Sequence, residues 1–399
     1  MDRGARVEIN LESLREKINL IDQELVELFE QRMEIVTSIA EHKRRSNKDI
    51  YDSNREKKVI EQAKSQLKNE NLEEYLVLFL ENLMAISRQY QGDTMQCETF
   101  TQQDIDVLPN TDILANTGIA SAPEKKQNIP IGFYGQIGSF SEEATIQYFG
   151  DGYVRKGYSR FDEVISALLN DEISVGVLPV ENSSTGTISD VMDLIRDNDI
   201  YITGELIQKI RQHLLVIPGT KLSDIETVYS HHQGIEQTSK FLKQHSFEQI
   251  IFKSTADSAR LVKELGDKTK AAIGSQRCAD IYGLEILAPD IHYNNNNYTR
   301  FITIEKNLSV NSDCNKISII MDIAHRTGAL FDVLRLFKHN SINLIKIESR
   351  PIIGEPWQYM FFFDFEGNLQ NDSVQTLLKC LKGMSQSFRL LGNYVSQEI

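Results

Sequence analysis

Apolar residues recur at helical spacing near the start of the chain. They stand at Leu11, Leu14, Ile18, Ile21, Leu25, Leu28, Phe29, Met33, Val36 and Ile39. This period predicts one amphipathic helix of about 35 residues, ~50 Å long. Shorter helices are expected from Asp52 to Leu67 and from Leu72 to Gln91, because no glycine or proline occurs between Ala5 and Gln91. A 50 Å helix cannot bury its apolar stripe alone, which predicts a helical dimer.

The pattern changes after residue 92. Residues 93–128 are rich in Gln, Asn, Thr, Ser and Asp, and they are expected to form a linker. From Ile129 onward, short apolar runs alternate with helical segments, which predicts an α/β domain with parallel sheets at 129–306. Its strands are expected at 131–134, 174–178, 227–230, 249–252, 271–273 and 301–304.

Residues 315–399 have a third pattern, of strand, helix, strand, strand, helix and strand. The strands are expected at 317–321, 342–348, 359–365 and 389–394, and the helices at 329–339 and 373–384. This is the split βαβ order of a ferredoxin-like α+β domain. The sequence therefore predicts a multidomain chain, with an all-α domain at 5–92, an α/β domain and this third domain.

Composition narrows the possible functions. The 399 residues carry a net charge of −14, which argues against nucleic acid as a partner. No apolar run approaches the roughly 20 residues of a membrane span, and no signal segment is recognised, so a cytoplasmic protein is expected. The four cysteines lack CxxC spacing, which favours neither a zinc site nor disulfides. We expect no metal and no organic cofactor.

Polar residues share helix faces in the first segment. They are Arg15, Arg32 and Lys43, then Asp52, Arg55 and Glu56, then Ser87 and Gln91. Arg32 and Lys43 lie about three turns apart on one face, roughly 16 Å from each other. Arg15 points about 100° away and is available to a dimer partner. On a solvated helix, such residues would merely form ion pairs with one another.

The ordered strings 14–22, 31–32, 43, 52–56 and 87–91 resemble the all-helical chorismate mutase family over about 85 residues. The resemblance implies an intertwined dimer in which Arg15 reaches the partner's site. It implies that Arg15, Arg32 and Arg55 hold substrate carboxylates and that Lys43 and Gln91 bond the breaking ether oxygen. Asp52 and Glu56 would hold the ring hydroxyl and local geometry, and Ser87 would bind substrate. A pericyclic reaction needs such positioning, not a nucleophile.

Four motifs mark the α/β segment: a glycine-rich turn at 135–142, Pro-Val-Glu-Asn-Ser-Ser-Thr-Gly at 179–186, Ser230-His231-His232-Gln233 with Gln237, and Asn-Tyr-Thr-Arg-Phe at 297–301. Together they resemble prephenate dehydratase over 129–305, and Gln136 stands where that family usually has proline. The resemblance implies a site in the cleft between two lobes. Thr299 would donate to the leaving hydroxyl and Arg300 would anchor a carboxylate.

The same resemblance makes Asn182, Ser230 and Gln237 polar positioning residues, with Glu181 a further candidate. The histidines His213, His231 and His232 share no ligand spacing with a carboxylate or cysteine. We therefore interpret them as structural or polar contacts, not as metal ligands.

Two strings in the third domain, Gly328-Ala329-Leu330 and Glu348-Ser349-Arg350-Pro351, resemble the regulatory ACT domain of phenylalanine-sensitive enzymes. The resemblance implies phenylalanine bound at these residues, with the helix N-terminus facing its carboxylate. Thr327 replaces the usual proline, which predicts a changed effector affinity. A dimerisation module without a ligand is the alternative.

Together, the three resemblances imply a bifunctional enzyme that converts chorismate through prephenate to phenylpyruvate, inhibited by phenylalanine, as a homodimer or homotetramer. Three alternatives stay open. They are a two-lobed solute-binding protein with an ACT sensor, an enzyme in which only one activity is live, and an ACT-containing transcription regulator.

Overall fold

The computed structural model describes residues 11–46, 53–96, 129–352 and 358–397. The chain divides into two compact units, Met1–Asn116 and Thr117–Ile399. Their boundary falls within the segment expected to be a linker, most of which lies outside the described residues. Each unit is described by itself.

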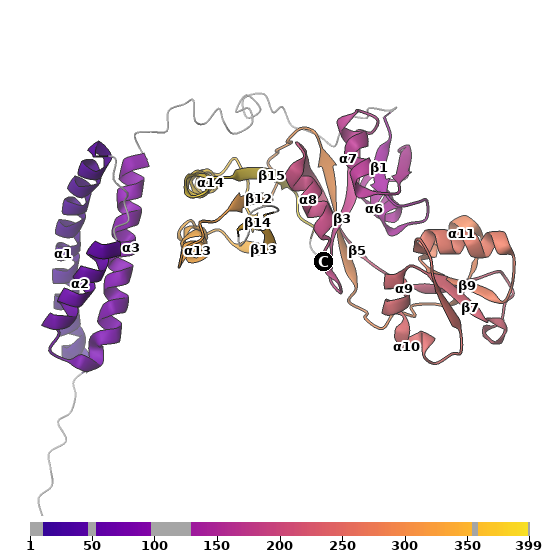
Figure 1. The fold of residues 1–399 in the computed structure, drawn as a ribbon, viewed down its shortest axis with the longest axis horizontal. Coiled ribbons are helices and arrows are strands. Elements are labelled where there is room, and N and C mark those ends of the chain that lie inside the picture. Colours follow the sequence, from indigo (N-terminus) through magenta and orange to yellow (C-terminus); the bar gives the residue numbers. More distant parts are fainter. Residues whose placement is uncertain (1–10, 47–52, 97–128, 353–357, 398–399) are drawn as a thin grey trace, which may run out of the picture. The chain divides into compact units, whose positions relative to one another are not determined.

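The described residues of the first unit form three α-helices, drawn in indigo and purple in Figure 1. They are α1 (Leu11–Arg45), α2 (Ser53–Gln66) and α3 (Glu73–Gln96), with a 3₁₀ turn at Glu70–Leu72. The helices expected from the sequence are confirmed, although α3 continues past Gly92 to Gln96. Helix α3 packs against both α1 and α2. Among the described residues of this unit, the buried apolar side chains are Val36 and Ala40 on α1 and Met84 on α3.

Most apolar side chains of α1 are not covered by their own chain. Ile18 is 56% exposed, Leu25 is 47% exposed and Ile35 is 63% exposed. On α3, Leu78 and Phe79 are likewise more than half exposed. The stripe that the sequence predicts is therefore present, and it faces outward in the single chain.

The second unit is built on two sheets. The ten-stranded sheet has the order β13-β14-β12-β15-β5-β11-β3-β1-β2, with β4 beside β3. Its strands are β1 (Ile131–Tyr134), β2 (Arg155–Tyr158), β3 (Val175–Asn182), β4 (Gly186–Thr187), β5 (Tyr201–Lys209), β11 (Tyr298–Glu305), β12 (Lys316–Asp322), β13 (Leu344–Pro351), β14 (Tyr359–Glu366) and β15 (Phe388–Tyr394). Its helices are α6 (Phe140–Phe149), α7 (Phe161–Leu169), α8 (Ser189–Asp197), α13 (Ala329–His339) and α14 (Asp372–Met384).

The five-stranded sheet forms a second lobe, in the order β10-β6-β9-β7-β8. Its strands are β6 (His213–Val216), β7 (Thr227–Ser230), β8 (Glu248–Ile251), β9 (Lys270–Gly274) and β10 (Glu285–Ala288). Its helices are α9 (His232–Gln237), α10 (Ser239–Leu242), α11 (Thr255–Leu265) and α12 (Gln276–Tyr282), with a 3₁₀ turn at Leu222–Asp224. The expected two-lobed architecture is confirmed.

The expectation of parallel sheets holds only in part. Strand β1 is parallel to β2 and β3, and β7 is parallel to β8 and β9. Strand β11 is instead antiparallel to both β3 and β5. The reason is the chain path. The chain leaves the first lobe after Lys209 and returns at Tyr298, so the outgoing and returning strands run in opposite directions.

The central strands of the first lobe bury both faces. On one face, Phe133, Val177, Leu206 and Phe301 pack with Ala144 of α6. A separate cluster on the other face joins Val180 and Ile302 to α7, α8 and the C-terminal strands, among them Phe362 on β14. The adjacent residues Phe301 and Ile302 of β11 therefore point to opposite faces of the sheet and pack in different clusters.

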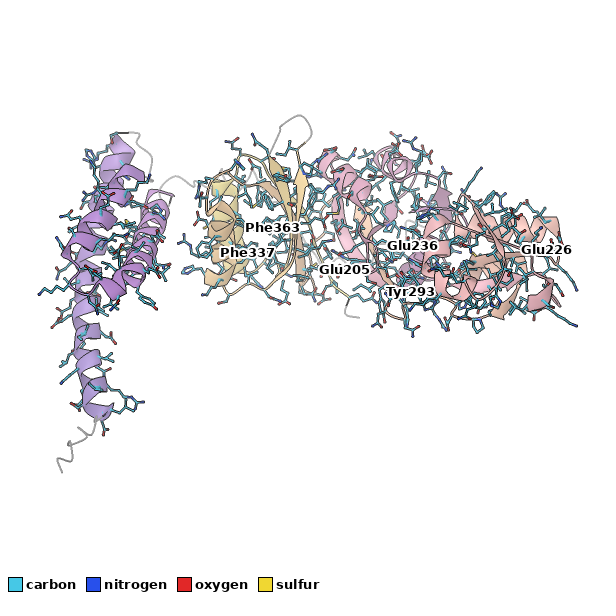
Figure 2. The ribbon with its side chains drawn as sticks, turned by 60° about the horizontal axis from the view of Figure 1, so that its bottom comes forward. Glu205, Glu226, Glu236, Tyr293, Phe337 and Phe363 are labelled. Atoms are coloured by element: carbon cyan, nitrogen blue, oxygen red, sulfur yellow. The ribbon has the colours of Figure 1, made fainter. Side chains whose placement is uncertain are left out.

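The C-terminal ferredoxin-like domain is also confirmed. Helices α13 and α14 lie on one side of its strands (Figure 1), and Phe337 packs on Phe363 there (Figure 2), with ring centroids 5.8 Å apart. The sheet joins the first lobe where Gly392 on β15 pairs with Ile202 on β5. A Cβ on Gly392 would lie 2.1 Å from the Ile202 carbonyl oxygen, so only glycine permits this approach.

Candidate functional sites

In the helical unit, an arginine and a serine meet between α1 and α3. Arg32 Nη1 donates to Ser87 Oγ, and Ser87 Oγ also donates to the Leu83 carbonyl at 2.8 Å. Burial lowers the pKa of Arg32, because its charged guanidinium has lost water. A bound carboxylate would compensate for that loss. The structure thus brings together two residues that the sequence proposed, from positions 55 apart.

Gln91 lies one turn beyond Ser87 on α3. Its side chain is 7% exposed, and its Oε1 has no hydrogen-bond partner within the described part of the chain. A buried amide oxygen normally has a hydrogen-bond partner, so this atom can accept one more bond. Glu56 is half-buried and pairs with Arg88, Lys43 is half-buried, and Arg55 is exposed. Asp52 lies outside the described residues.

Arg15 stands apart from these residues. It is exposed and precedes Arg32 by 17 positions on the same helix, a distance of about 25 Å along the axis. One copy of α1 cannot bring both arginines to one small substrate.

In the α/β unit, three polar side chains form a row across three neighbouring strands. Thr299 on β11 is in register with Asn182 on β3 and with Gln208 on β5. Asn182 Nδ2 donates to Thr299 Oγ1 at 2.9 Å and to Asn297 Oδ1 at 2.8 Å. Thr299, Asn182 and Gln208 are 7%, 8% and 5% exposed. They lie on the face covered by α6, at the end of β11 that enters from the second lobe.

The segment before Thr299 is fixed by the Pro-Val-Glu-Asn-Ser motif. Ser183 Oγ accepts from the Tyr298 N–H at 2.9 Å and donates to the Asn296 carbonyl at 2.9 Å. Asn297 is 1% exposed, and its Nδ2 donor is unpaired among the described residues. The two motifs that the sequence separates by more than 110 positions therefore build one polar site.

Two glutamines at this site were missed by sequence reasoning. Gln208 and Gln212 are 5% and 3% exposed, and each has an Oε1 without a hydrogen-bond partner among the described residues. Gln212 Nε2 donates to Gln237 Oε1 at 3.3 Å, which ties the expected residue Gln237 to the site. The signal in the sequence is an amide side chain that directly follows two apolar residues, at Leu206-Ile207-Gln208.

Ser230, which was expected to position the substrate, lies inside the second lobe. Its side chain is fully buried, and Oγ donates to the Ile273 carbonyl at 3.1 Å across β7 and β9. A Cβ at Gly234 would lie 2.3 Å from Oγ, so α9 packs directly over this hydroxyl. Ser230 thus links β7 to β9 in the second lobe, and its expected role at the substrate stays a prediction.

Arg300, which was expected to anchor a substrate carboxylate, lies on the other face of β11 from the polar row. Residues alternate across a strand, so Arg300 faces away from Thr299 and toward the C-terminal domain. Its guanidinium donates to Glu205 at 2.7 Å, to Asp364 at 2.7 Å and to the Tyr394 hydroxyl at 2.8 Å. Each of its three nitrogens donates to a group of the protein.

The glycine-rich turn joins the two lobes. The Gly138 N–H donates to Glu142 Oε2 at 2.7 Å, and Cys278 Sγ on α12 donates to the Gly138 carbonyl at 3.0 Å. Arg277 on α12 binds both oxygens of Glu142. Burial alone would raise the pKa of Glu142, but Arg277, the Gly138 N–H and Arg155 outweigh burial and lower it. The turn is thus a contact between the two lobes. The Gly138 N–H already donates to Glu142.

Two of the histidines, His213 and His231, accept hydrogen bonds from the backbone. His213 Nδ1 accepts the Asp290 N–H at 3.0 Å, and His231 Nδ1 accepts the Gln233 N–H at 3.4 Å. Burial lowers the pKa of both, so they are neutral acceptors at pH 7. Within the described ranges, no group of three His, Cys, Asp or Glu side chains is arranged to hold a metal ion. None of the described helices is long and apolar enough to cross a membrane.

The expected effector residues divide between two places. Gly328, with φ of 80°, precedes α13, where Ala329 is buried and Leu330 is partly exposed. On β13, Arg350 donates to Ser189 at 2.6 Å and to Asp193 at 2.7 Å. Glu348 accepts from Thr187, and Ser349 points to the opposite, exposed side. Glu348 and Arg350 therefore bind the first lobe.

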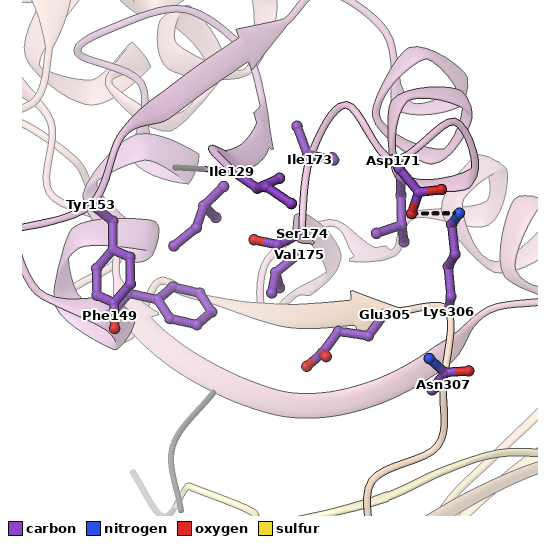
Figure 3. Close-up of a pocket in the computed structure, with 12 residues that line it drawn as sticks. Ile129, Phe149, Tyr153, Asp171, Ile173, Ser174, Val175, Glu305, Lys306 and Asn307 are labelled. Carbon is purple, nitrogen blue, oxygen red and sulfur yellow. Dashed lines mark ion pairs between the residues drawn. The ribbon is translucent and has the colours of Figure 1, made fainter. Parts of the chain in front are cut away.

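A separate cavity of about 280 Å³ opens at the other end of the first lobe, near Ile129, Phe149 and Tyr153 (Figure 3). Its wall includes Glu305, at the far end of β11 from Thr299, and an ion pair of 2.8 Å between Lys306 and Asp171. Six residues of strand span about 20 Å. The cavity is therefore not part of the polar row.

Comparison with known proteins agrees with this arrangement. The chorismate mutase type II profile matches residues 14–92, and the prephenate dehydratase profile matches residues 131–309. A bifunctional chorismate mutase/prephenate dehydratase from Enterobacter agglomerans is 31% identical over 393 residues, which cover 97% of this chain and 96% of that protein.

Two solved structures resemble the second unit. Prephenate dehydratase from Arthrobacter aurescens, in complex with L-Phe, is 28% identical with a TM-score of 0.62, covering 67% of this chain and 90% of that one. GqqA, described as a quorum quenching acylase, is 26% identical with a TM-score of 0.62, covering 67% of this chain and 98% of that one.

A helical unit followed by a two-lobed α/β enzyme with a ferredoxin-like domain defines a two-activity isomerase and lyase. The chain belongs to the bifunctional chorismate mutase/prephenate dehydratase family.

Proposed function

We propose that residues 14–92 rearrange chorismate to prephenate in a site that two copies of the helical unit build together. Arg32 and Arg55 hold the substrate carboxylates with Arg15 of the partner subunit, because guanidinium forks suit a dicarboxylate. Lys43 and Gln91 donate to the ether oxygen as it gains charge. Glu56, Asp52 and Ser87 hold the ring hydroxyl and the geometry. The burial of Gln91 one turn beyond the Arg32–Ser87 contact supports this proposal.

The exposed stripe on α1 supports the dimer. Ile18, Ile21 and Leu25 are each 47–56% exposed, and leaving such a row in water costs about 25 cal/mol per Å² of apolar surface. A second copy of the same helix offers a matching stripe and the missing arginine. We propose a homodimer or homotetramer, with the mutase domain at 5–92.

We propose that residues 129–306 convert prephenate to phenylpyruvate at the Asn182–Thr299–Gln208 row. The reaction breaks the bond to the ring hydroxyl and the bond to the ring carboxylate, whose electron pair enters the ring as carbon dioxide leaves. Hydroxide is a poor leaving group, so a hydrogen-bond donor must meet it. Thr299 is that donor, and Asn182, Gln237 and the neighbouring amides orient the substrate. The Asn182–Thr299 hydrogen bond carries this assignment.

We further propose that phenylalanine inhibits the dehydratase through residues 315–399. Gly328, Ala329 and Leu330 supply the helix N-terminus for its carboxylate. The exposed face of β13, with Ile345, Ile347 and Ser349, borders a second copy. The complex of the Arthrobacter relative with L-Phe supports the choice of effector. In the Glu348-Ser349-Arg350-Pro351 string, Glu348 connects β13 to Thr187 on β4, and Arg350 connects it to α8.

One coupled assay on the full chain tests these assignments. Chorismate and prephenate are supplied separately, and phenylpyruvate is measured with and without phenylalanine. Thr299→Val should abolish product from both substrates while chorismate still yields prephenate. Arg32→Ala should abolish product from chorismate alone. If Thr299→Val turns prephenate over at the unsubstituted rate, the row is not the dehydratase site.

A further inference from the structure

A buried network of charges joins the strand of Thr299 to the C-terminal domain. Arg300 binds Glu205 on β5 and Asp364 on β14, and Lys316 on β12 binds Glu205 at 2.9 Å. The two cations balance the two anions. The side chains of Glu205, Lys316, Asp364 and Arg300 are only 1%, 7%, 10% and 14% exposed.

Two hydroxyl groups complete the network. Ser318 Oγ on β12 lies 2.5 Å from Asp364 Oδ1 and 2.7 Å from the Tyr394 hydroxyl. Tyr394 in turn accepts from Arg300 at 2.8 Å. Burial alone would raise the pKa of Asp364, but Arg300, Ser318 and Lys316 outweigh it and lower that pKa. Charges buried to this degree tolerate little displacement, because each lost partner leaves an unpaired charge out of water.

A second contact reaches the other strand of the site. Lys346 on β13 binds Glu181 at 2.8 Å, and Glu181 directly precedes Asn182. Arg300 Nη1 lies 3.8 Å from the same carboxylate. A cavity of about 20 Å³ beside Arg300, Lys346 and Asp364 has room for about one water molecule. The three strands that carry the row, β3, β5 and β11, are therefore all held from behind by the C-terminal sheet.

We propose that Arg300 is a positioning residue, and that this network transmits the state of the C-terminal domain to Thr299 and Asn182. Arg300 and Thr299 are consecutive on one strand, so a shift of the Asp364 carboxylate moves the backbone that aims the Thr299 hydroxyl. The inference rests on the proposed function in one respect, that phenylalanine is the ligand whose binding moves the C-terminal domain.

The test removes single hydroxyl groups and leaves all charges paired. Tyr394→Phe and Ser318→Ala are compared in the full chain with Tyr153→Phe, a tyrosine of the same unit outside the network. Arg300→Lys is the stronger variant, since lysine cannot bind three groups in a fork. The readouts are kcat and KM for prephenate, the phenylalanine concentration for half inhibition, and phenylalanine binding by calorimetry.

Tyr394→Phe should lower kcat about three- to tenfold with KM within twofold, and Arg300→Lys should lower it further. The affinity of Tyr394→Phe for phenylalanine should stay within about twofold of that of the unsubstituted enzyme. Half inhibition of this variant should nevertheless need about tenfold more phenylalanine. Unchanged kcat and inhibition in Tyr394→Phe and Ser318→Ala would overturn the proposal. If phenylalanine fails to bind the unsubstituted enzyme, the effector assignment fails, and the kcat measurements still decide the positioning role.

Discussion

Asn182 and Thr299 are joined by a hydrogen bond whose direction is fixed by the surrounding backbone. Asn182 Oδ1 accepts the N–H groups of Ser184 at 2.9 Å and Thr185 at 3.2 Å, so the amide nitrogen must face Thr299. That nitrogen donates to Thr299 Oγ1 at 2.9 Å. Because Oγ1 is the acceptor here, the hydroxyl hydrogen of Thr299 is available to another group. A threonine is a weak acid, so its value as a donor comes from this orientation.

Replacing Asn182 by aspartate tests the orientation. Asn182→Asp keeps the acceptor for Ser184 and Thr185 but removes the donor, so the Thr299 hydroxyl turns to donate to the new carboxylate. We expect the dehydratase kcat to fall about 100-fold, within the range for loss of one positioned donor. Steady-state rates with prephenate measure this. Asn170→Asp, at an exposed site of the same lobe, should change nothing, and equal rates in the two variants would contradict the assignment.

Gln208 provides a second test at the same row. A buried amide oxygen without a partner costs about 1–3 kcal/mol of stability. Gln208→Leu removes this cost together with the hydrogen bond of the amide to Glu143, so the thermal midpoint should stay about unchanged. The same change should lower kcat/KM for prephenate about tenfold, because the amide then has no contact to offer the substrate. A lower kcat/KM without a lower thermal midpoint would identify Gln208 as a functional residue. The exposed Gln249→Leu is the control, and a loss of both quantities would indicate a structural role.

The sequence predicted most of this architecture because its signals are local. The period of 3.6 residues predicts the position and length of α1, and the order of strands and helices predicts the ferredoxin-like domain. It did not predict β5, whose residues Tyr201–Lys209 mix polar and apolar side chains without strict alternation. Gln208 was missed for that reason. The partners of Arg300 come from β5, β14 and β15, and no local pattern indicates such distant pairing.

Arg32→Lys tests the mutase site. Lysine keeps the charge but loses the fork, so we expect kcat/KM for chorismate to fall about 100-fold. Arg45→Lys at the end of the same helix is the matched control, because Arg45 is 79% exposed and pairs only loosely with Glu41 at 3.8 Å. Dehydration of added prephenate should be unaffected in both variants. Loss of that activity in Arg32→Lys would mean that the substitution disturbs more than the mutase site.

Cys278 should be inert to thiol reagents in the folded enzyme. Burial raises the pKa of its thiol to about 11, and the side chain is fully buried at the contact between the lobes. The thiolate is the reactive form, and less than about one part in a thousand of this thiol is ionised at pH 7.5. Native wild type and Cys278→Ser should therefore show equal numbers of reactive thiols, differing by one only after denaturation. One additional reactive thiol in the native wild type would mean that the lobes separate.

His213 should make the second unit less stable in mild acid. Its Nδ1 accepts the Asp290 N–H and burial lowers its pKa, so the folded protein binds a proton there less readily than the unfolded chain does. The stabilisation is complete above pH ~6.5, the ordinary histidine pKa, and is lost as pH falls through the lower folded-state pKa, at about 1.4 kcal/mol per pKa unit of difference. The thermal midpoint should therefore decrease between pH 7.5 and 5.5. His213→Gln keeps an acceptor without the charge, so it should reduce that decrease, although His231 contributes a part with the same sign. An identical pH dependence in wild type and His213→Gln would assign the acid sensitivity to other groups.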